Sequence, residues 1–324
     1  MKRNNYLVLC ITITLSLLLI CGKCADKRDI QIINMVENVG SIPVSIPILN
    51  KLDVNNSGGH LQGIQYYKYN QKEYFYLSGS SDSNSYYSIV KMGRENSVIS
   101  VNNILPKPYK HAGGFQISNN LMAIGVEDNS ARNKSKVFIY RIENPENPPE
   151  EPLDIIERIG EEKRATAGCT GIIEISDYLL VVVGDWDTEH LDFYRINKNM
   201  LGVEDKTFNL VYSIDVKKAN KSEWINNIWY KYQNINFIKD SAENLYLVGM
   251  ASNFNGENIL DFFRIENIDY SKFSLKKILT KKYPLNEHAK FQWGGGVYIS
   301  KNNRLEIFSC SAHLDEKSKI IIYK

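Results

Sequence analysis

The side chains best suited to catalysis or ligand binding in this sequence are its five histidines and four tryptophans. Imidazole groups exchange protons near neutral pH and bind metals, and indole rings stack on flat ligands such as sugars. Carboxylates stand close to them in sequence, as in Asp185-Trp186-Asp187. Histidines and carboxylates together can perform acid–base hydrolysis or hold a divalent cation. These side chains can act together only if the fold brings them to one place.

One short motif recurs five times and sets the frame for these residues. The segment His60-Leu-Gln-Gly-Ile-Gln65 matches His111-Ala-Gly-Gly-Phe-Gln116, and weaker copies occur at 168–173, 231–236 and 293–298. The central position of the five copies is Gly63, Gly114, Gly171, Asn234 and Gly296, and successive positions are 51 to 63 residues apart. Each copy is followed by further short runs of β-branched and aromatic residues, which are typical of strands.

Four strands in each repeat of this length resemble the β-propeller architecture. We therefore expect an all-β fold over residues 26–324, a single five-bladed β-propeller with four-stranded antiparallel blades. The fifth repeat has only three strands before Lys324. A strand at residues 29–38 is expected to complete that last blade and close the ring, because closure removes an exposed edge. Two stacked β-sandwiches are the rival arrangement, but nothing resembling a linker divides the chain.

The propeller arrangement also predicts which face carries chemistry. Because successive strands of a blade run antiparallel, the segments before strand one and the loops between strands two and three open on the same face. All five histidines and all four tryptophans fall in these segments, and loops carry function disproportionately. We predict a ligand-binding site where the central channel opens on this face, formed by His60, Gln65, His111, Gln116, Asp185, Trp186, Asp187 and Trp293.

Several of these side chains could have a structural role instead of a role in ligand binding. His60 and His111 can bond loop backbones, and Gln65 and Gln116 can tie neighbouring inner strands together, as buried amides commonly do. Tryptophans can anchor loops through the indole N–H.

Five-bladed propellers include glycoside hydrolases, in which catalytic carboxylates lie on the channel-lining strands. The corresponding positions in this chain are not acidic; they are Gln65, Gln116, Ile173, Asn236 and Tyr298. We therefore expect a non-enzymatic protein that binds a glycan, a peptide or another protein. The alternative is a hydrolase that uses the histidines and carboxylates of this face, with or without a divalent cation as cofactor.

Residues 1–25 have the pattern of a secretory signal peptide. Lys2 and Arg3 precede an uncharged, mostly apolar run over 6–20, which is shorter than a membrane-spanning helix requires. We expect a secreted or extracytoplasmic protein with no transmembrane span. Cys21 is the residue that a lipid anchor would modify.

Charge and cysteine content exclude other classes. Basic and acidic residues are nearly balanced, so the chain has no electrostatic footprint for nucleic acid. Beyond the signal only Cys169 and Cys310 remain, which is no disulfide framework. We expect two separate buried thiols.

Overall fold

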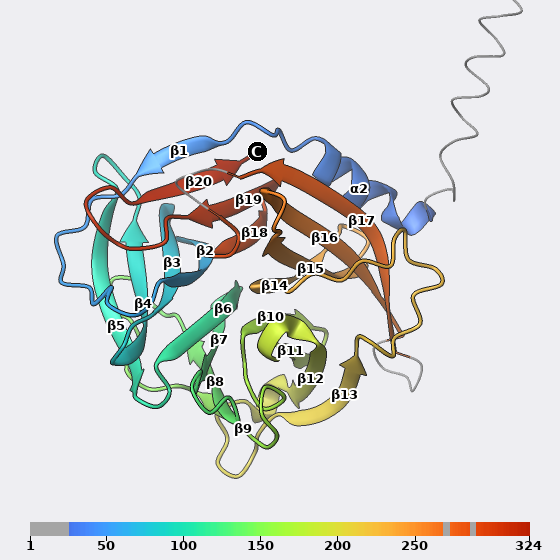
Figure 1. Ribbon diagram of the computed structural model, residues 1–324, viewed down its shortest axis with the longest axis horizontal. Coiled ribbons are helices and arrows are strands. Elements are labelled where there is room, and N and C mark those ends of the chain that lie inside the picture. The colour runs from blue at the N-terminus through green and yellow to red at the C-terminus, as the bar shows by residue number, and fades with distance from the viewer. Residues whose placement is uncertain (1–25, 268–272, 286–289) are drawn as a thin grey trace, which may run out of the picture.

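The short β-rich runs of the sequence assemble into five blades around a central axis in the computed structural model (Figure 1). The structure describes residues 26–267, 273–285 and 290–324. The expected signal peptide, residues 1–25, and His288 lie outside the described residues. The chain is a five-bladed β-propeller, as predicted.

The first three blades each contain four consecutive strands. Blade 1 consists of β2 (Leu61–Tyr69), β3 (Lys72–Ser80), β4 (Asn84–Lys91) and β5 (Ser97–Pro106). Blade 2 consists of β6 (His111–Ser118), β7 (Leu121–Glu127), β8 (Lys134–Arg141) and β9 (Asp154–Ile159). Blade 3 consists of β10 (Cys169–Ile175), β11 (Tyr178–Gly184), β12 (His190–Asn197) and β13 (Asn209–Asp215), with the 3-10 turns η2 (Trp186–Thr188) and η3 (Lys198–Met200).

The last two blades complete the ring. Blade 4 consists of β14 (Asn234–Lys239), β15 (Leu245–Ser252), β16 (Glu257–Glu266) and β17 (Ser274–Pro284). Blade 5 consists of β18 (Gly295–Ile299), β19 (Leu305–Cys310), β20 (Lys319–Tyr323) and β1 (Val44–Pro47). Two helical segments precede β1 in the chain, η1 (Lys27–Asp29) and α2 (Ile30–Glu37).

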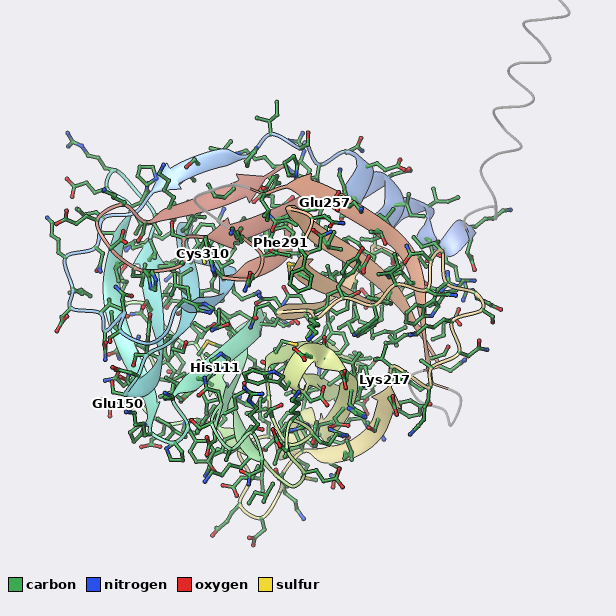
Figure 2. The ribbon with its side chains drawn as sticks, viewed as in Figure 1. His111, Glu150, Lys217, Glu257, Phe291 and Cys310 are labelled. Atoms are coloured by element: carbon green, nitrogen blue, oxygen red, sulfur yellow. The ribbon has the colours of Figure 1, made fainter. Side chains whose placement is uncertain are left out.

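The inner strands approach one another so closely that glycine is required on them. A Cβ on Gly114 would lie 2.2 Å from the carbonyl oxygen of Gln233, and one on Gly296 would lie 2.0 Å from that of Ile64. Real Cβ atoms do not come so close to backbone, so only glycine fits at these two positions. Apolar and aromatic side chains fill the space between the blades (Figure 2).

An N-terminal strand closes the ring, as predicted, but different residues form it. The strand is β1, which pairs antiparallel with β20 and so becomes the outermost strand of blade 5. The prediction of a strand at 29–38 is wrong, because residues Ile30–Glu37 form α2. Ile32, Met35 and Val36, spaced three and one apart, share one helical face and are buried.

Helix α2 is fixed to blade 4 by two basic side chains. Lys281 donates hydrogen bonds to the carbonyls of Val36 and Val39, each at 2.6 Å, where a cation complements the helix C-terminus. Arg264 forms an ion pair with Asp29 in which each side chain is only 3% exposed.

Two further expectations bear on the chain's class. Cys169 and Cys310 are buried free thiols, as expected, and burial raises the pKa of both. No helix within the described ranges is both long enough and apolar enough to cross a bilayer.

We predict that Asp29→Ala destabilises the fold, because it leaves the buried guanidinium of Arg264 short of a carboxylate partner. The expected loss in the free energy of unfolding, measured by urea titration, is about 2 to 3 kcal/mol. Asp26→Ala is the matched control, since Asp26 also contacts Arg264 but is partly exposed. Equal stability of the two variants would contradict the prediction.

Candidate functional site

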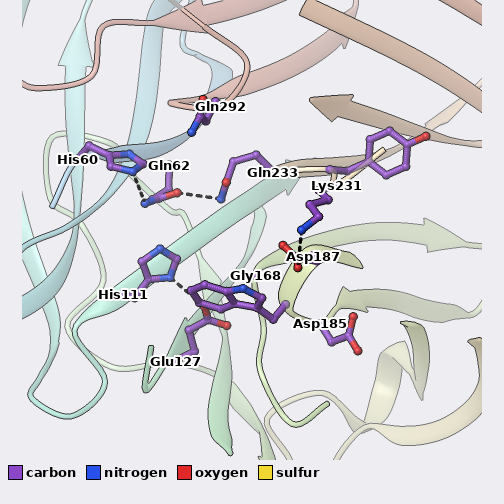
Figure 3. A pocket seen from close by; sticks show the side chains of 12 residues that line it. His60, Gln62, His111, Glu127, Gly168, Asp185, Asp187, Lys231, Gln233 and Gln292 are labelled. Carbon is purple, nitrogen blue, oxygen red and sulfur yellow. Dashed lines mark hydrogen bonds and ion pairs between the residues drawn. The ribbon is translucent and has the colours of Figure 1, made fainter. Parts of the chain in front are cut away.

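A pocket of about 220 Å³ opens at the mouth of the central channel (Figure 3). All five blades contribute to its wall, which contains His60, Gln62, His111, Glu127, Gly168, Asp185, Trp186, Asp187, Lys231, Tyr232, Gln233 and Gln292. Because every blade takes part, the pocket lies on the axis of the ring.

The structure brings five of the eight predicted site residues together here: His60, His111, Asp185, Trp186 and Asp187. The pocket also contains charged and amide side chains that the sequence analysis did not select, above all Glu127. Glu127 is the last residue of β7, and the end of strand two opens on the same face as the start of strand one. That topological rule places Glu127 on the face that carries the histidines.

The other three predicted residues lie outside this pocket. Gln116 accepts hydrogen bonds from the amides of Ile172 (3.0 Å) and Phe237 (2.8 Å), and Gln65 donates one to Asn236 Oδ1 (3.1 Å). These buried amides tie inner strands of different blades together, some of them across the ring, which is close to the structural role given above as their alternative. Trp293 has the Lys290 ammonium 4.8 Å from its ring centre.

His60 is held as a neutral imidazole. Its Nδ1 lies 2.6 Å from the Leu61 carbonyl oxygen, which can only accept, so Nδ1 carries the proton. Gln62 Nε2 lies 3.4 Å from the other ring nitrogen. Burial lowers the pKa of His60, and the neighbouring His111 and His313 lower it further. At neutral pH this ring therefore presents Nε2 as an acceptor.

His111 and Glu127 form a pair across β6 and β7, where they are register partners. His111 Nδ1 lies 3.0 Å from Glu127 Oε1, although the two atoms lack the alignment of a hydrogen bond. Glu127 is fully buried, and its Oε2 accepts the amide of Ala167 at 2.7 Å. The second ring nitrogen of His111 faces His60 and Gln62 (Figure 3). A carboxylate behind an imidazole orients the ring and its proton.

Asp185 follows β11 and faces the loop rather than the centre of the pocket. Its two oxygens accept hydrogen bonds from the backbone amide (2.8 Å) and Nδ1 (2.7 Å) of His190. Burial raises the pKa of Asp185, against the opposing effect of His190. Asp185 therefore ties the residue before η2 to the first residue of β12.

Asp187 extends from η2 toward the pocket centre, where Lys231 Nζ lies 2.8 Å from its carboxylate (Figure 3). The backbone there is strained, since both Asp187 (φ 67°) and Thr188 (φ 53°) are left-handed. The left-handed region is disfavoured for residues other than glycine, and most of all for a β-branched residue. Such strain persists only where surrounding contacts hold it, and it clusters at functional sites.

The tryptophans serve different purposes. Trp186 lines the pocket and stacks against Arg132, whose guanidinium carbon lies 4.2 Å from the ring centre. Trp224 and Trp229 are loop anchors, with indole N–H groups that donate to the carbonyls of Leu275 (2.8 Å) and Thr188 (2.9 Å).

Within the part of the chain that the structure describes, no three His, Cys, Asp or Glu side chains are grouped so that they could hold a metal ion. The divalent cation considered from the sequence therefore has no such ligand set among the described residues.

No family model and no curated protein matches this chain. Solved structures do match. The catalytic domain of a Coprinopsis cinerea GH62 α-L-arabinofuranosidase is 11% identical, covers 88% of this chain and 98% of its own, and has a TM-score of 0.50. A GH62 hydrolase in complex with xylotriose is 10% identical over 90% and 100%, with a TM-score of 0.50. The GH43_1 enzyme from Xanthomonas citri, complexed with xylotriose, is 10% identical over 90% and 92%, with the same TM-score. At these identities the likeness establishes the fold alone.

The expectation of a non-enzymatic binding protein is contradicted by this comparison, because these three proteins, matched over about nine-tenths of the chain, are an α-L-arabinofuranosidase, a GH62 hydrolase and a GH43_1 enzyme. The expectation rested on the missing acids of the inner strands. The carboxyls of the pocket wall instead come from other positions: Glu127 ends β7 in blade 2, and Asp185 and Asp187 follow β11 in blade 3.

We predict that Gly114→Ala distorts the pocket. Its Cβ would lie 2.2 Å from the carbonyl oxygen of Gln233, a residue of the pocket wall. Forcing the inner strands apart is expected to lower the free energy of unfolding by about 2 to 3 kcal/mol in a denaturant titration.

Gly93→Ala is the control, because beyond Gly93 and its two chain neighbours no described atom lies within 4 Å of a Cβ at that position. It is expected to change stability by less than about 0.5 kcal/mol. A Gly114→Ala variant as stable as this control would contradict the prediction, because the inner strands would then accommodate a Cβ at position 114.

Proposed function

We propose that this protein is a hydrolase that cleaves glycosidic bonds in an oligosaccharide bound at the mouth of the channel. The observation that carries the proposal is the pair of acid–base groups in one pocket: His111 backed by the buried Glu127, and Asp187 beside Lys231. The fold supports it, since proteins that share the fold are glycoside hydrolases, two of them in complexes with xylotriose.

Glycoside hydrolysis needs one group that protonates the leaving oxygen and a second that activates water or attacks the sugar. In this proposal the His111–Glu127 pair donates its proton to the glycosidic oxygen as the bond to the anomeric carbon breaks. Asp187 takes a proton from the water that attacks that carbon, with the Lys231 ammonium as its counter-ion. The two products are the free sugar and the shortened oligosaccharide.

Neutral groups of the wall suit sugar hydroxyls. Gln233 Nε2 donates to Gln62 Oε1 at 2.8 Å, so each amide keeps groups that can bond a hydroxyl. The neutral His60 adds an acceptor beside Gln62. A sugar that enters the pocket thus meets both donors and acceptors around the ring axis.

The test is hydrolysis of a panel of 4-nitrophenyl glycosides and xylo-oligosaccharides by the wild type, Glu127→Gln and Asp187→Asn. Loss of general acid–base catalysis is expected to lower kcat by about 10²- to 10⁴-fold in each variant. Glu174→Gln is the matched control, because Glu174 is a surface residue paired with Lys198 and is expected to keep full activity. A wild type that cleaves no member of the panel, or two fully active variants, would overturn the proposal.

We also propose that the protein is exported, with residues 1–25 removed as a signal peptide. The Lys2-Arg3 charge and the apolar run that follows support this. Mass analysis of the chain purified from its natural host is expected to find a mature N-terminus close to Asp26. A chain that retains Met1 in the cytoplasm would refute export, and a lipid on Cys21 would identify a membrane-anchored form.

A further inference from the structure

The strained turn that presents Asp187 is held by a loop from the neighbouring blade. Thr188 receives two hydrogen bonds from that loop: the amide of Tyr232 donates to its hydroxyl at 2.9 Å, and the indole of Trp229 donates to its carbonyl at 2.9 Å. The Thr188 hydroxyl itself donates to the carbonyl of Asp187 at 2.7 Å. The left-handed conformation of the turn therefore depends on where residues 229–232 lie.

This loop is in turn fixed by an ion pair buried inside blade 4. Asp261 on β16 and Lys277 on β17 lie 2.7 Å apart, and both side chains are 0% exposed. Lys277 also donates to the carbonyl of Ile228 at 2.6 Å and to Asn226 Oδ1 at 3.1 Å. An ammonium has three N–H donors, so these three acceptors satisfy it completely and fasten the loop to the blade.

Tyr232 joins the ion pair to the pocket. Its phenol donates a hydrogen bond to Asp261 Oδ2, and Thr280 donates one to Asp261 Oδ1. Tyr232 lines the pocket, and its backbone amide is the group that contacts Thr188. An unbroken series of contacts thus runs from Lys277 through Asp261, Tyr232 and Thr188 to Asp187.

Stability alone is a poor reason for such a pair. Removing two charges from water costs about as much as their attraction returns, and well-packed apolar residues in place of a buried pair are often equally or more stable. A buried pair with every donor satisfied does, however, define one geometry for the loop that it bonds. The strained turn at Asp187 depends on a loop of fixed geometry, because nothing in the turn's own sequence favours the left-handed region at Thr188.

We propose that Tyr232, Asp261 and Lys277 are positioning residues that hold Asp187 in place for hydrolysis. This inference rests on the proposed function for its chemistry and on the contacts above for its geometry. It predicts that weakening the series of contacts displaces Asp187 without removing any group that touches the sugar's reacting bond. A displacement of about 1 Å at a reacting group lowers the rate by up to roughly 100-fold.

The test compares Tyr232→Phe and Lys277→Met with a matched control. Tyr283→Phe is the control, because Tyr283 is buried in the same blade and its hydroxyl has no hydrogen-bond partner among the described residues. In the two test variants we expect kcat to fall about 10- to 100-fold while KM changes less than about twofold, since substrate contacts remain. The control is expected to keep wild-type kcat and KM.

A second measurement does not depend on hydrolysis. Hydrogen exchange at the backbone amide of residue 232 and at the Trp229 indole N–H is expected to be at least about tenfold faster in both variants, and unchanged in Tyr283→Phe. If Lys277→Met does not fold, Tyr232→Phe, which removes one oxygen atom, decides alone.

The outcomes separate the two proposals. Unchanged exchange and unchanged kcat in Tyr232→Phe and Lys277→Met would overturn the positioning role. A fall in kcat of the same size in the Tyr283→Phe control would also overturn it, because the effect would then be general to blade 4. Faster exchange in a protein whose wild type hydrolyses nothing would support the link to the Asp187 turn and refute the proposed function alone.

Discussion

The structure depends on how closely five inner strands can approach one axis. At Gly114 and Gly296 even a methyl group would overlap the backbone of another blade. Below the mouth, the channel is therefore filled by short contacts and by bonded amides such as Gln116, whose oxygen accepts two backbone N–H groups from different blades. The pocket that contains the histidines lies at the mouth, where loops place larger side chains.

A ring of similar blades also limits how a site can arise. Repetition gives each blade the same backbone, so a site has to come from positions at which the blades differ. Blade 1 supplies the neutral His60, blade 2 the His111–Glu127 pair, and blade 3 the left-handed turn at Asp187. The described residues of blade 4 contribute no acid to the pocket wall. Blade 4 contributes the loop with Tyr232, which is held by the buried Lys277. These four blades therefore contribute different groups to the pocket.

Much of this could be predicted from the sequence. The repeated glycine predicted the five blades, and strand direction predicted the face on which His60 and His111 meet. The helix over residues 30–37 was missed because Ile30 to Val36 is as apolar as a strand, and only the spacing of its buried residues distinguishes it. The closing strand β1 was missed because its side chains are mostly exposed. A short strand at the outer edge of a blade buries few side chains, so its sequence shows little hydrophobic pattern.

The site was harder to predict because it depends on pairs that are distant in sequence. Nothing near Glu127 indicates that His111 will cover it, and nothing near Asp187 indicates that Thr188 will be held by Tyr232, 44 residues further on. Pairing of this kind follows from register and from blade-to-blade contact, which no local pattern encodes. The strained turn makes the point most clearly. Its conformation is unfavourable to Asp187 and Thr188 themselves, so the contacts that maintain it have to come from elsewhere in the fold. The series of contacts leads to the fully buried Asp261–Lys277 pair.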